Sequence, residues 1–131
     1  MKRLCVIAEA NPFIIRLLQR FAEKIGLDVL LVQVGQDVLD LAHQKKPAVI
    51  VIDPELPGKM RGWEVIRLLR EDVEACQIPV IACTWMDEGA LREMAGEVNG
   101  RLQKPDMHYM DFVNALMKAG VLPGQIPSMN D

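Results

Sequence analysis

The stretch Ala48-Val49-Ile50-Val51-Ile52 is the most apolar segment of the chain, and it ends abruptly on the charged residue Asp53. A continuous apolar run of strand length is typical of a strand buried on both faces, as in a parallel sheet covered by helices. A carboxylate that follows such a strand is costly to hold there unless it has a partner or a function. Residues 48–53 therefore predict a central strand with a functional residue at its carboxyl end.

Four more strand-length runs accompany this segment, and stretches with helical spacing separate all five. The expected strands cover residues 4–8, 29–34, 48–52, 79–83 and 101–103. The expected helices cover residues 13–25, 37–44, 63–69, 88–97 and 109–119, and the first of them is capped by Asn11 and ended by Gly26. This alternation predicts an α/β fold, a doubly wound parallel sheet of order 2-1-3-4-5 with helices on both faces.

Length and composition bound the kind of protein. A chain of 131 residues is one domain, expected here over residues 1–120, with residues 121–131 as a C-terminal tail or the start of a linker to a longer protein. The net charge of −3 argues against a nucleic-acid surface, and no apolar run is long enough to span a membrane or to form a signal peptide. Three cysteines at no metal-binding spacing fit a reducing, cytoplasmic location.

Polar residues end four of the expected strands. They are Glu9, Asp53, Thr84 and Lys104. In a doubly wound sheet the ligand site lies at the carboxyl ends of the strands, so we expect these side chains to converge. A carboxylate can accept a phosphoryl group when a lysine, a hydroxyl and a metal ion neutralise the charge. A structural alternative stays open, in which Asp53 caps the following turn and Lys104 is its plain ion-pair partner.

Five segments, in order, resemble the receiver domain of two-component response regulators, and the resemblance extends over residues 3–119. The segments are Val-Ile-Ala-Glu-Ala-Asn-Pro (6–12), Val-Ile-Asp-Pro-Glu-Leu-Pro-Gly (51–58), Gly-Trp-Glu-Val (62–65), Pro-Val-Ile-Ala-Cys-Thr (79–84) and Asn-Gly-Arg-Leu-Gln-Lys-Pro (99–105).

This resemblance implies a flavodoxin-like (βα)₅ fold and a place in a phosphorelay. It implies Asp53 as the phosphoacceptor from a histidine kinase, with Thr84 and Lys104 as the switch threonine and lysine. It implies Mg²⁺ as the cofactor, held by Glu9, Asp53 and the backbone carbonyl of Glu55. It also implies a cis bond between Lys104 and Pro105, and a partner surface over residues 88–119.

One departure from the family pattern concerns the metal, and another concerns the loop after Asp53. The family usually has two adjacent acids after the first strand, whereas this chain reads Glu9-Ala10, so the direct Mg²⁺ ligand is missing. The loop at residues 58–62 is one residue longer than usual and lacks its customary acid. Because Mg²⁺ is usually held by only one or two carboxylates, the loss of one is serious. Glu9 is longer than aspartate, however, and its reaching the metal is an open alternative.

Two further departures concern the switch. Trp85 stands where the family has a very small residue, and Arg101 stands where it has an aromatic one. We expect Trp85 to be exposed in the loop and to crowd the space above Asp53. Arg101 either compensates by pairing with Asp53 or a bound phosphate, or is a solvated charge at the strand end. The sequence thus predicts that Mg²⁺-dependent phosphorylation of Asp53 is weak or absent.

Two function hypotheses follow. The first is a phosphorylation-driven receiver whose partners are a histidine kinase or phosphotransfer protein and a downstream output domain or protein; a homodimer is also possible. The alternative is an atypical receiver, a protein-interaction module that works without phosphate. A cofactor enzyme or a hydrolase is poorly supported: no phosphate-cradling glycines follow residue 8, no Gly-x-Ser-x-Gly occurs, and His43 and His108 are expected on helix surfaces. We therefore expect no enzymatic activity.

Overall fold

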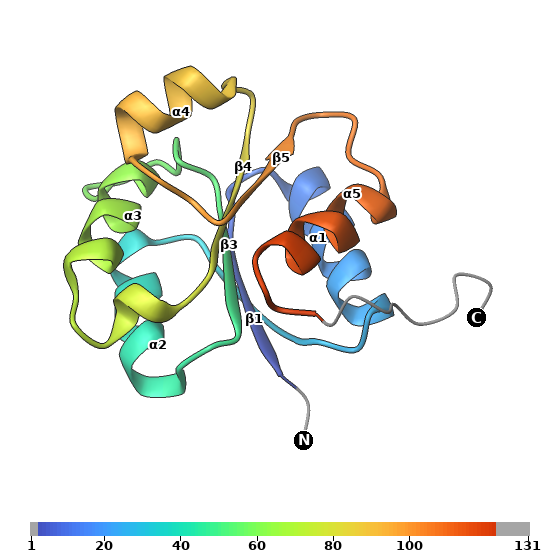
Figure 1. The fold of residues 1–131 in the computed structure, drawn as a ribbon, viewed down its shortest axis with the longest axis horizontal. Helices are drawn as coiled ribbons and strands as arrows, with labels where there is room; N and C mark the ends of the chain where they lie inside the picture. Colours follow the sequence, from blue (N-terminus) through green and yellow to red (C-terminus); the bar gives the residue numbers. More distant parts are fainter. Residues whose placement is uncertain (1–2, 123–131) are drawn as a thin grey trace.

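The computed structural model describes residues 3–122, and in them five parallel strands form one sheet in the order β2-β1-β3-β4-β5 (Figure 1). The strands are β1 (Leu4–Ala8), β2 (Asp28–Val32), β3 (Val49–Ile52), β4 (Val80–Thr84) and β5 (Gly100–Gln103). The helices are α1 (Pro12–Lys24), α2 (Gly35–Lys45), α3 (Gly62–Glu71), α4 (Glu88–Ala95) and α5 (Tyr109–Lys118), with a short 3₁₀ turn at Ala75–Gln77. The α/β class, the strand order and the flavodoxin-like (βα)₅ arrangement expected from the sequence are confirmed.

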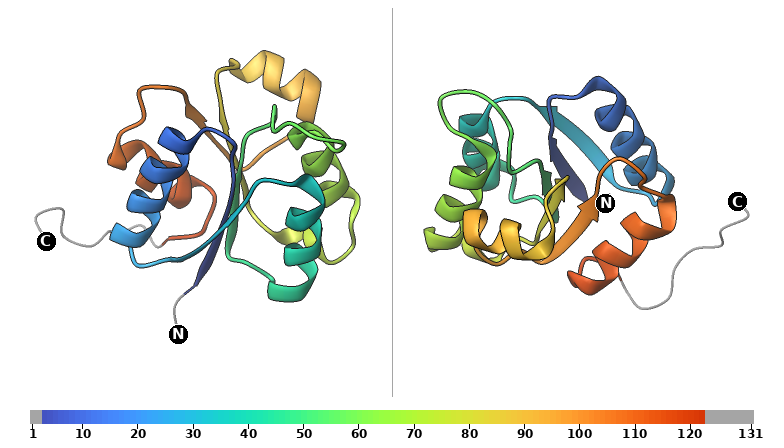
Figure 2. Two further views of the ribbon diagram at one scale, coloured as in Figure 1. Left: turned by 180° about the vertical axis from the view of Figure 1, so that it is seen from behind. Right: turned by 90° about the horizontal axis from the view of Figure 1, so that it is seen from above.

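The sheet separates two hydrophobic cores. Helices α1 and α5 cover one face, and α2, α3 and α4 cover the other, as Figure 2 shows from two further sides. The four residues of β3 alternate between these cores, and each of them is fully buried. The central strand is apolar throughout because it has no solvent-facing side. A polar residue at its end therefore lies at an edge of the sheet that is partly shielded from water.

The first βα connection follows its local signals. Asn11 caps α1, since its side-chain oxygen accepts hydrogen bonds from the amides of Phe13 at 2.9 Å and Ile14 at 3.2 Å. Pro12 begins the helix, where a missing amide hydrogen costs nothing. Gly26 follows the helix with φ of +94°, a conformation that glycine adopts without strain.

The second strand is shorter than expected. It ends at Val32, not at residue 34, and Gly35 begins α2 instead of closing the strand. Packing leaves no room for a side chain at Gly35: a Cβ atom there would lie 2.8 Å from the backbone oxygen of Met60 and 2.9 Å from a methyl carbon of Val65. The glycine is required by the contact between α2 and the β3–α3 region, which the local sequence does not reveal.

The ends of the described range belong to the packed domain. Val121 is buried, and its carbonyl accepts a hydrogen bond from the guanidinium of Arg3. The expected tail begins at residue 121, but its residues 123–131 lie outside the described part of the chain. Within residues 3–122, no helix combines the length and the apolar character needed to cross a bilayer.

Candidate functional site

Four polar residues lie at the carboxyl ends of four strands. Glu9 follows β1, Asp53 follows β3, Thr84 ends β4 and Lys104 follows β5. Glu9, Thr84 and Lys104 are buried, whereas the side chain of Asp53 keeps 15 % of its surface exposed. Because the strands are parallel and adjacent, these residues meet at one edge of the sheet. The site thus has a single acid that solvent and a partner can reach.

Lys104 connects the two acids of this edge. Its Nζ lies 2.9 Å from Asp53 Oδ2, to which it donates a hydrogen bond, and 2.8 Å from Glu9 Oε1, with which it forms an ion pair. The Lys104–Pro105 peptide bond is cis, as predicted, and the backbone amide of Lys104 donates to the Thr84 carbonyl at 2.9 Å. The expected convergence of Glu9, Asp53 and Lys104 is confirmed.

The charge of Lys104 depends on these partners. Burial by itself disfavours an ammonium ion and lowers its pKa. The hydrogen bonds and charges of Glu9 and Asp53 outweigh this cost, so the pKa of Lys104 is raised above its ordinary value of 10.5. Lys104 therefore carries a positive charge at neutral pH and supplies it to the position between the two acids.

The remaining carboxylate oxygens also have protein partners. Glu9 Oε2 accepts the backbone amides of Ala10 at 3.1 Å and Asn11 at 2.9 Å. Asp53 Oδ1 accepts the backbone amide of Glu55 at 2.8 Å, which closes a turn after β3. The side chain of Glu55 is exposed. Among the described hydrogen bonds, Glu55 contacts Asp53 only through its backbone amide. Both features of the structural alternative, the cap and the ion pair, are therefore present at Asp53.

These residues do not form a complete divalent-cation site. Ala10 contributes no side-chain oxygen, and within residues 3–122 no three His, Cys, Asp or Glu side chains gather as a metal-binding group. The available donors are the carboxylates of Glu9 and Asp53 and the backbone carbonyl of Glu55. Three of the four carboxylate oxygens accept hydrogen bonds, whereas Glu9 Oε1 is held only by its ion pair with Lys104, whose ammonium lies close to both acids. Mg²⁺ favours near-ideal octahedral oxygen coordination, so this donor set fits it poorly.

Gly62, the first residue of α3, supports the site through a backbone contact. A Cβ atom on Gly62 would lie 1.9 Å from the backbone oxygen of Asp53. The first turn of α3 therefore lies directly against the backbone of Asp53, and Trp63 donates its amide to the Pro54 carbonyl at 2.8 Å. The signal for this contact was present in the Gly-Trp-Glu-Val segment (62–65), but only the fold shows what the glycine touches.

Residues of the expected switch lie beside the β4–α4 loop. Thr84 Oγ1 accepts the backbone amide of Met86 at 3.0 Å, and Trp85 is 63 % exposed, as predicted. The suggestion that Arg101 pairs with Asp53 is wrong. Its guanidinium donates instead to the Met86 carbonyl at 2.9 Å and to the side-chain oxygen of Gln103. Arg101 is half-buried and lies opposite Ala82 of β4, the strand that separates β5 from β3.

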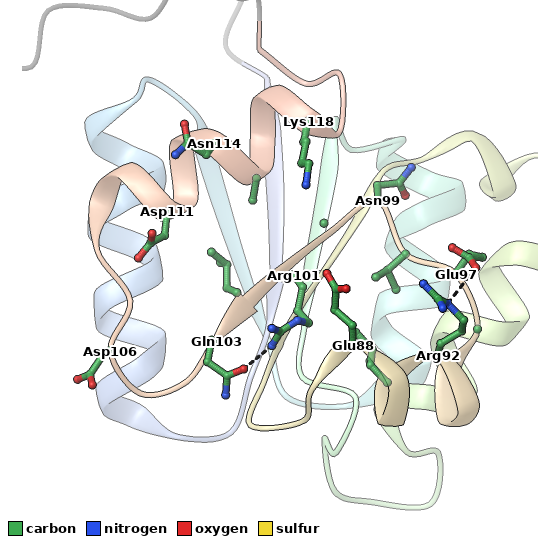
Figure 3. A pocket seen from close by; sticks show the side chains of 16 residues that line it. Glu88, Arg92, Glu97, Asn99, Arg101, Gln103, Asp106, Asp111, Asn114 and Lys118 are labelled. Atoms are coloured by element: carbon green, nitrogen blue, oxygen red, sulfur yellow. Dashed lines mark hydrogen bonds and ion pairs between the residues drawn. The ribbon is translucent and has the colours of Figure 1, made fainter.

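A groove of about 600 Å³ lies between α4, β5 and α5, on the face expected to meet partners (Figure 3). Leu91, Leu102 and Ala115 contribute apolar surface to it, and charged residues such as Glu88 and Lys118 surround them. The outer residues of α4 are exposed, so this helix is not covered within the monomer. The histidines lie elsewhere: His43 is on the surface of α2, and His108 is the N-cap of α5 and not a residue of a helix surface.

Comparisons with known proteins agree with this geometry. A family model described as "Response regulator receiver domain" matches residues 5–113. The polar-differentiation response regulator DivK of Brucella anthropi is 32 % identical over 109 residues, which cover 80 % of this chain and 86 % of DivK.

Two solved structures are similar in fold. The receiver domain of the sensor histidine kinase PA1611 from Pseudomonas aeruginosa PAO1, solved with a magnesium ion coordinated in its active site cleft, matches with a TM-score of 0.80 and 22 % identity. That match covers 92 % of this chain and 99 % of the other. The bacteriophytochrome response regulator AtBRR matches with a TM-score of 0.81 and 25 % identity, over 98 % of this chain and 99 % of AtBRR.

Proposed function

The chain belongs to the response regulator receiver domain family, and from this premise we propose that it accepts a phosphoryl group on Asp53 from a histidine kinase or a phosphotransfer protein. The observation that carries the proposal is the pairing of Asp53 with Lys104. Asp53 is the partly exposed acid at the end of the central strand, and an ammonium group lies 2.9 Å from its Oδ2. A carboxylate placed in this way can act as a nucleophile toward phosphorus.

Each polar residue at this edge of the sheet has its own role in the transfer. A carboxylate oxygen of Asp53 forms a P–O bond as the P–N bond to the donor histidine breaks, and the bonding electrons leave with the imidazole nitrogen. Lys104 neutralises charge on the acceptor and on the incoming phosphoryl group. The Thr84 hydroxyl accepts the Met86 amide and keeps its own hydrogen free to donate to a phosphoryl oxygen. The regulatory signal is then the charge on Asp53, which is a role in signalling and not in metabolism.

Receiver domains typically bind Mg²⁺ for this transfer. In this chain the residues that could hold it are Glu9, Asp53 and the backbone carbonyl of Glu55. We propose that the affinity is low, because Ala10 supplies no carboxylate and Lys104 already occupies the space between the two acids. Neutralisation of the phosphoryl charge then depends more on Lys104 than on the metal.

The missing carboxylate at position 10 also favours a second candidate function. The chain could act as an interaction module that works without phosphate, by presenting the surface around Trp85, α4 and the groove beside α5. Trp85 is 63 % exposed at the edge of that surface, and tryptophan is enriched at protein interfaces. In either case the partners we propose for residues 88–119 are an output domain or protein, or a second copy of the chain, in the cytoplasm.

Incubation with acetyl phosphate and Mg²⁺, followed by intact-mass spectrometry, tests the proposal. We expect slow addition of one phosphoryl group, lost in Asp53→Asn, which keeps the shape of the side chain and removes the nucleophilic charge. Addition that persists in Asp53→Asn would place the phosphate elsewhere and overturn the assignment. No addition at any donor concentration would favour the interaction module.

A further inference from the structure

The β4–α4 loop, residues 85–87, is held by side chains of the neighbouring strand. Arg101 donates from Nη1 to the Met86 carbonyl at 2.9 Å, and Gln103 donates from Nε2 to the Trp85 carbonyl at 3.1 Å. Two consecutive carbonyls of the loop are therefore bound by two residues of β5. Thr84, the last residue of β4, adds a third bond, since its hydroxyl oxygen accepts the Met86 amide at 3.0 Å.

The two β5 residues also bind each other. Arg101 Nη1 donates to the side-chain oxygen of Gln103, and the Gln103 amide nitrogen donates to the Lys104 carbonyl at 3.2 Å. Figure 3 shows the Arg101 and Gln103 side chains meeting beside the groove, joined by this bond. Each side chain therefore has an anchor on its own strand, so that both reach the loop from a defined position.

In the described part of the chain, neither of these two side chains bonds to a carboxylate of the acidic site, and the one contact with a site residue is made to the backbone of Lys104. Within the described residues, the Arg101 side chain bonds to Met86 and Gln103, and the Gln103 side chain bonds to Trp85 and to the backbone carbonyl of Lys104, so neither bonds to a carboxylate of Glu9 or Asp53. A change of charge at Asp53 consequently removes none of the contacts that these side chains make with the loop.

We propose that Arg101 and Gln103 are positioning residues that hold the β4–α4 loop in one conformation while Asp53 carries no phosphoryl group, whatever the charge on its side chain. Trp85 and the first turn of α4 are then presented to a partner in a preset arrangement, and binding does not have to order them first. The inference deepens the proposed function by assigning the conformation of the partner surface to β5, and it rests on that function only for the identity of the surface.

Amide hydrogen exchange at Met86 tests the inference, because this amide is bonded within the loop. In Arg101→Ala we expect the Met86 amide to exchange at least ten times faster than in the parent protein. The Ile81 amide, in the centre of β4, reports global unfolding and should change less than twofold. An unchanged rate at Met86, or an equal acceleration at both amides, would overturn the proposal.

Three further variants sharpen the test. Arg92→Ala removes an exposed arginine of the same groove that pairs with Glu97 at 3.3 Å, and it should leave Met86 exchange unchanged. Gln103→Glu keeps an acceptor for Arg101 but loses the donor to Trp85, so its Met86 rate should fall between those of the parent and Arg101→Ala.

Asp53→Asn tests the independence from the acidic site and should leave the Met86 rate within twofold. A tenfold change in this variant would show that the loop follows Asp53 and would contradict the inference. Since no phosphodonor or metal is present, these outcomes are separate from whether Asp53 accepts phosphate.

Discussion

Ala10 and Lys104 together determine how charge is balanced around Asp53. Ala10 offers only a methyl group and a backbone amide, and the amide is used by Glu9. Lys104 offers one fixed positive charge that both acids share. A site of this composition has its own internal cation, which explains at the level of single residues why we expect a bound metal ion to matter less here.

The first prediction restores the missing acid. Ala10 is exposed, so the aspartate of Ala10→Asp has room, and we expect Mg²⁺ to bind at least ten times more tightly. One charge-assisted contact is worth about 1.5–3 kcal/mol, or roughly ten- to a hundredfold in affinity. Calorimetric titration with Mg²⁺ measures the change, and Ala10→Asn is the uncharged control. Adding Trp85→Ala should further improve binding of beryllofluoride, a phosphoryl mimic, if Trp85 restricts access.

The outcome that would contradict this prediction is simple to observe. If the unmodified protein takes up phosphate on Asp53 within minutes at millimolar Mg²⁺, Glu9 is an adequate metal ligand. The interpretation of the chain as a weak phosphoacceptor would then be wrong.

The second prediction concerns the buried ion pair. Lys104→Met leaves the buried carboxylate of Glu9 without its counter-charge, and we expect the free energy of unfolding at neutral pH to fall by about 3 kcal/mol. Glu9→Gln added to this variant should recover part of the loss, because it removes the uncompensated acid. Urea denaturation measures both variants. A loss below about 1 kcal/mol in Lys104→Met would mean that solvent relieves the charge on Glu9.

At the scale of secondary-structure elements, the position of α3 is coupled to the site through Gly62. A methyl group at this position would lie 1.9 Å from the Asp53 carbonyl oxygen, which is far inside van der Waals contact. The clash is with backbone, so it cannot be relieved by rotation of a side chain. An alanine at position 62 therefore requires the backbone of the β3–α3 connection to shift.

The third prediction follows from this contact. Gly62→Ala should lower the free energy of unfolding by about 3 kcal/mol, at the upper end of the usual cost of overpacking. It should also slow phosphorylation beyond any effect of stability, since Asp53 is displaced. Gly89→Ala is the matched control: its Cβ would lie 3.4 Å from Asp87 Oδ1 in the exposed first turn of α4, where alanine favours the helix. Equal stability of the two variants would show that the connection adapts freely.

At the scale of the whole molecule, burial of two thiols in the core limits stability at alkaline pH. Burial raises the pKa of Cys5 and of Cys83 from 9.0 to about 12. The unfolded chain releases these protons near pH 9, whereas the folded chain keeps them to about pH 12. The unfolded state therefore binds fewer protons in this window, and the free energy of unfolding falls as the pH rises.

The fourth prediction is the magnitude of this decrease in the free energy of unfolding. At about pH 10 each buried thiol should cost about 1.4 kcal/mol relative to neutral pH, because one pKa unit corresponds to about 1.4 kcal/mol. The pKa of Lys104 is raised in the folded protein as well. Its contribution to the free energy of unfolding is therefore complete below its ordinary pKa of 10.5 and is lost as the pH rises through its folded-state pKa. The Lys104 contribution therefore steepens the decline only at higher pH.

Urea unfolding near pH 8 and near pH 10 measures the difference for each variant. In the double variant Cys5→Ala, Cys83→Ala the fall between the two pH values should be about 3 kcal/mol smaller than in the parent. Cys76→Ala, at a half-buried thiol outside the two cores, is the control and is expected to behave as the parent. An identical fall in all three proteins would rule out the thiols as its cause.

The sequence by itself determined the fold class, the strand order and the residues that line the rim. Apolar runs bounded by polar residues, such as 48–53, identify strands and their ends, and the carboxyl ends of parallel strands must share an edge. The Asn11 cap and the exposure of Trp85 could also be predicted, because they depend on neighbours within a few residues.

Only the tertiary structure decided what each of these residues touches. That Lys104 bridges Glu9 and Asp53, that Arg101 binds the β4–α4 loop instead of Asp53, and that Gly62 lies against the Asp53 backbone are contacts between separate strands, loops and helices. The close packing of Gly35 in α2 against Met60 is a contact of the same kind. Such contacts depend on separations of a few ångströms between separate elements, and these arise only when the elements pack together, so no local pattern in the sequence specifies them.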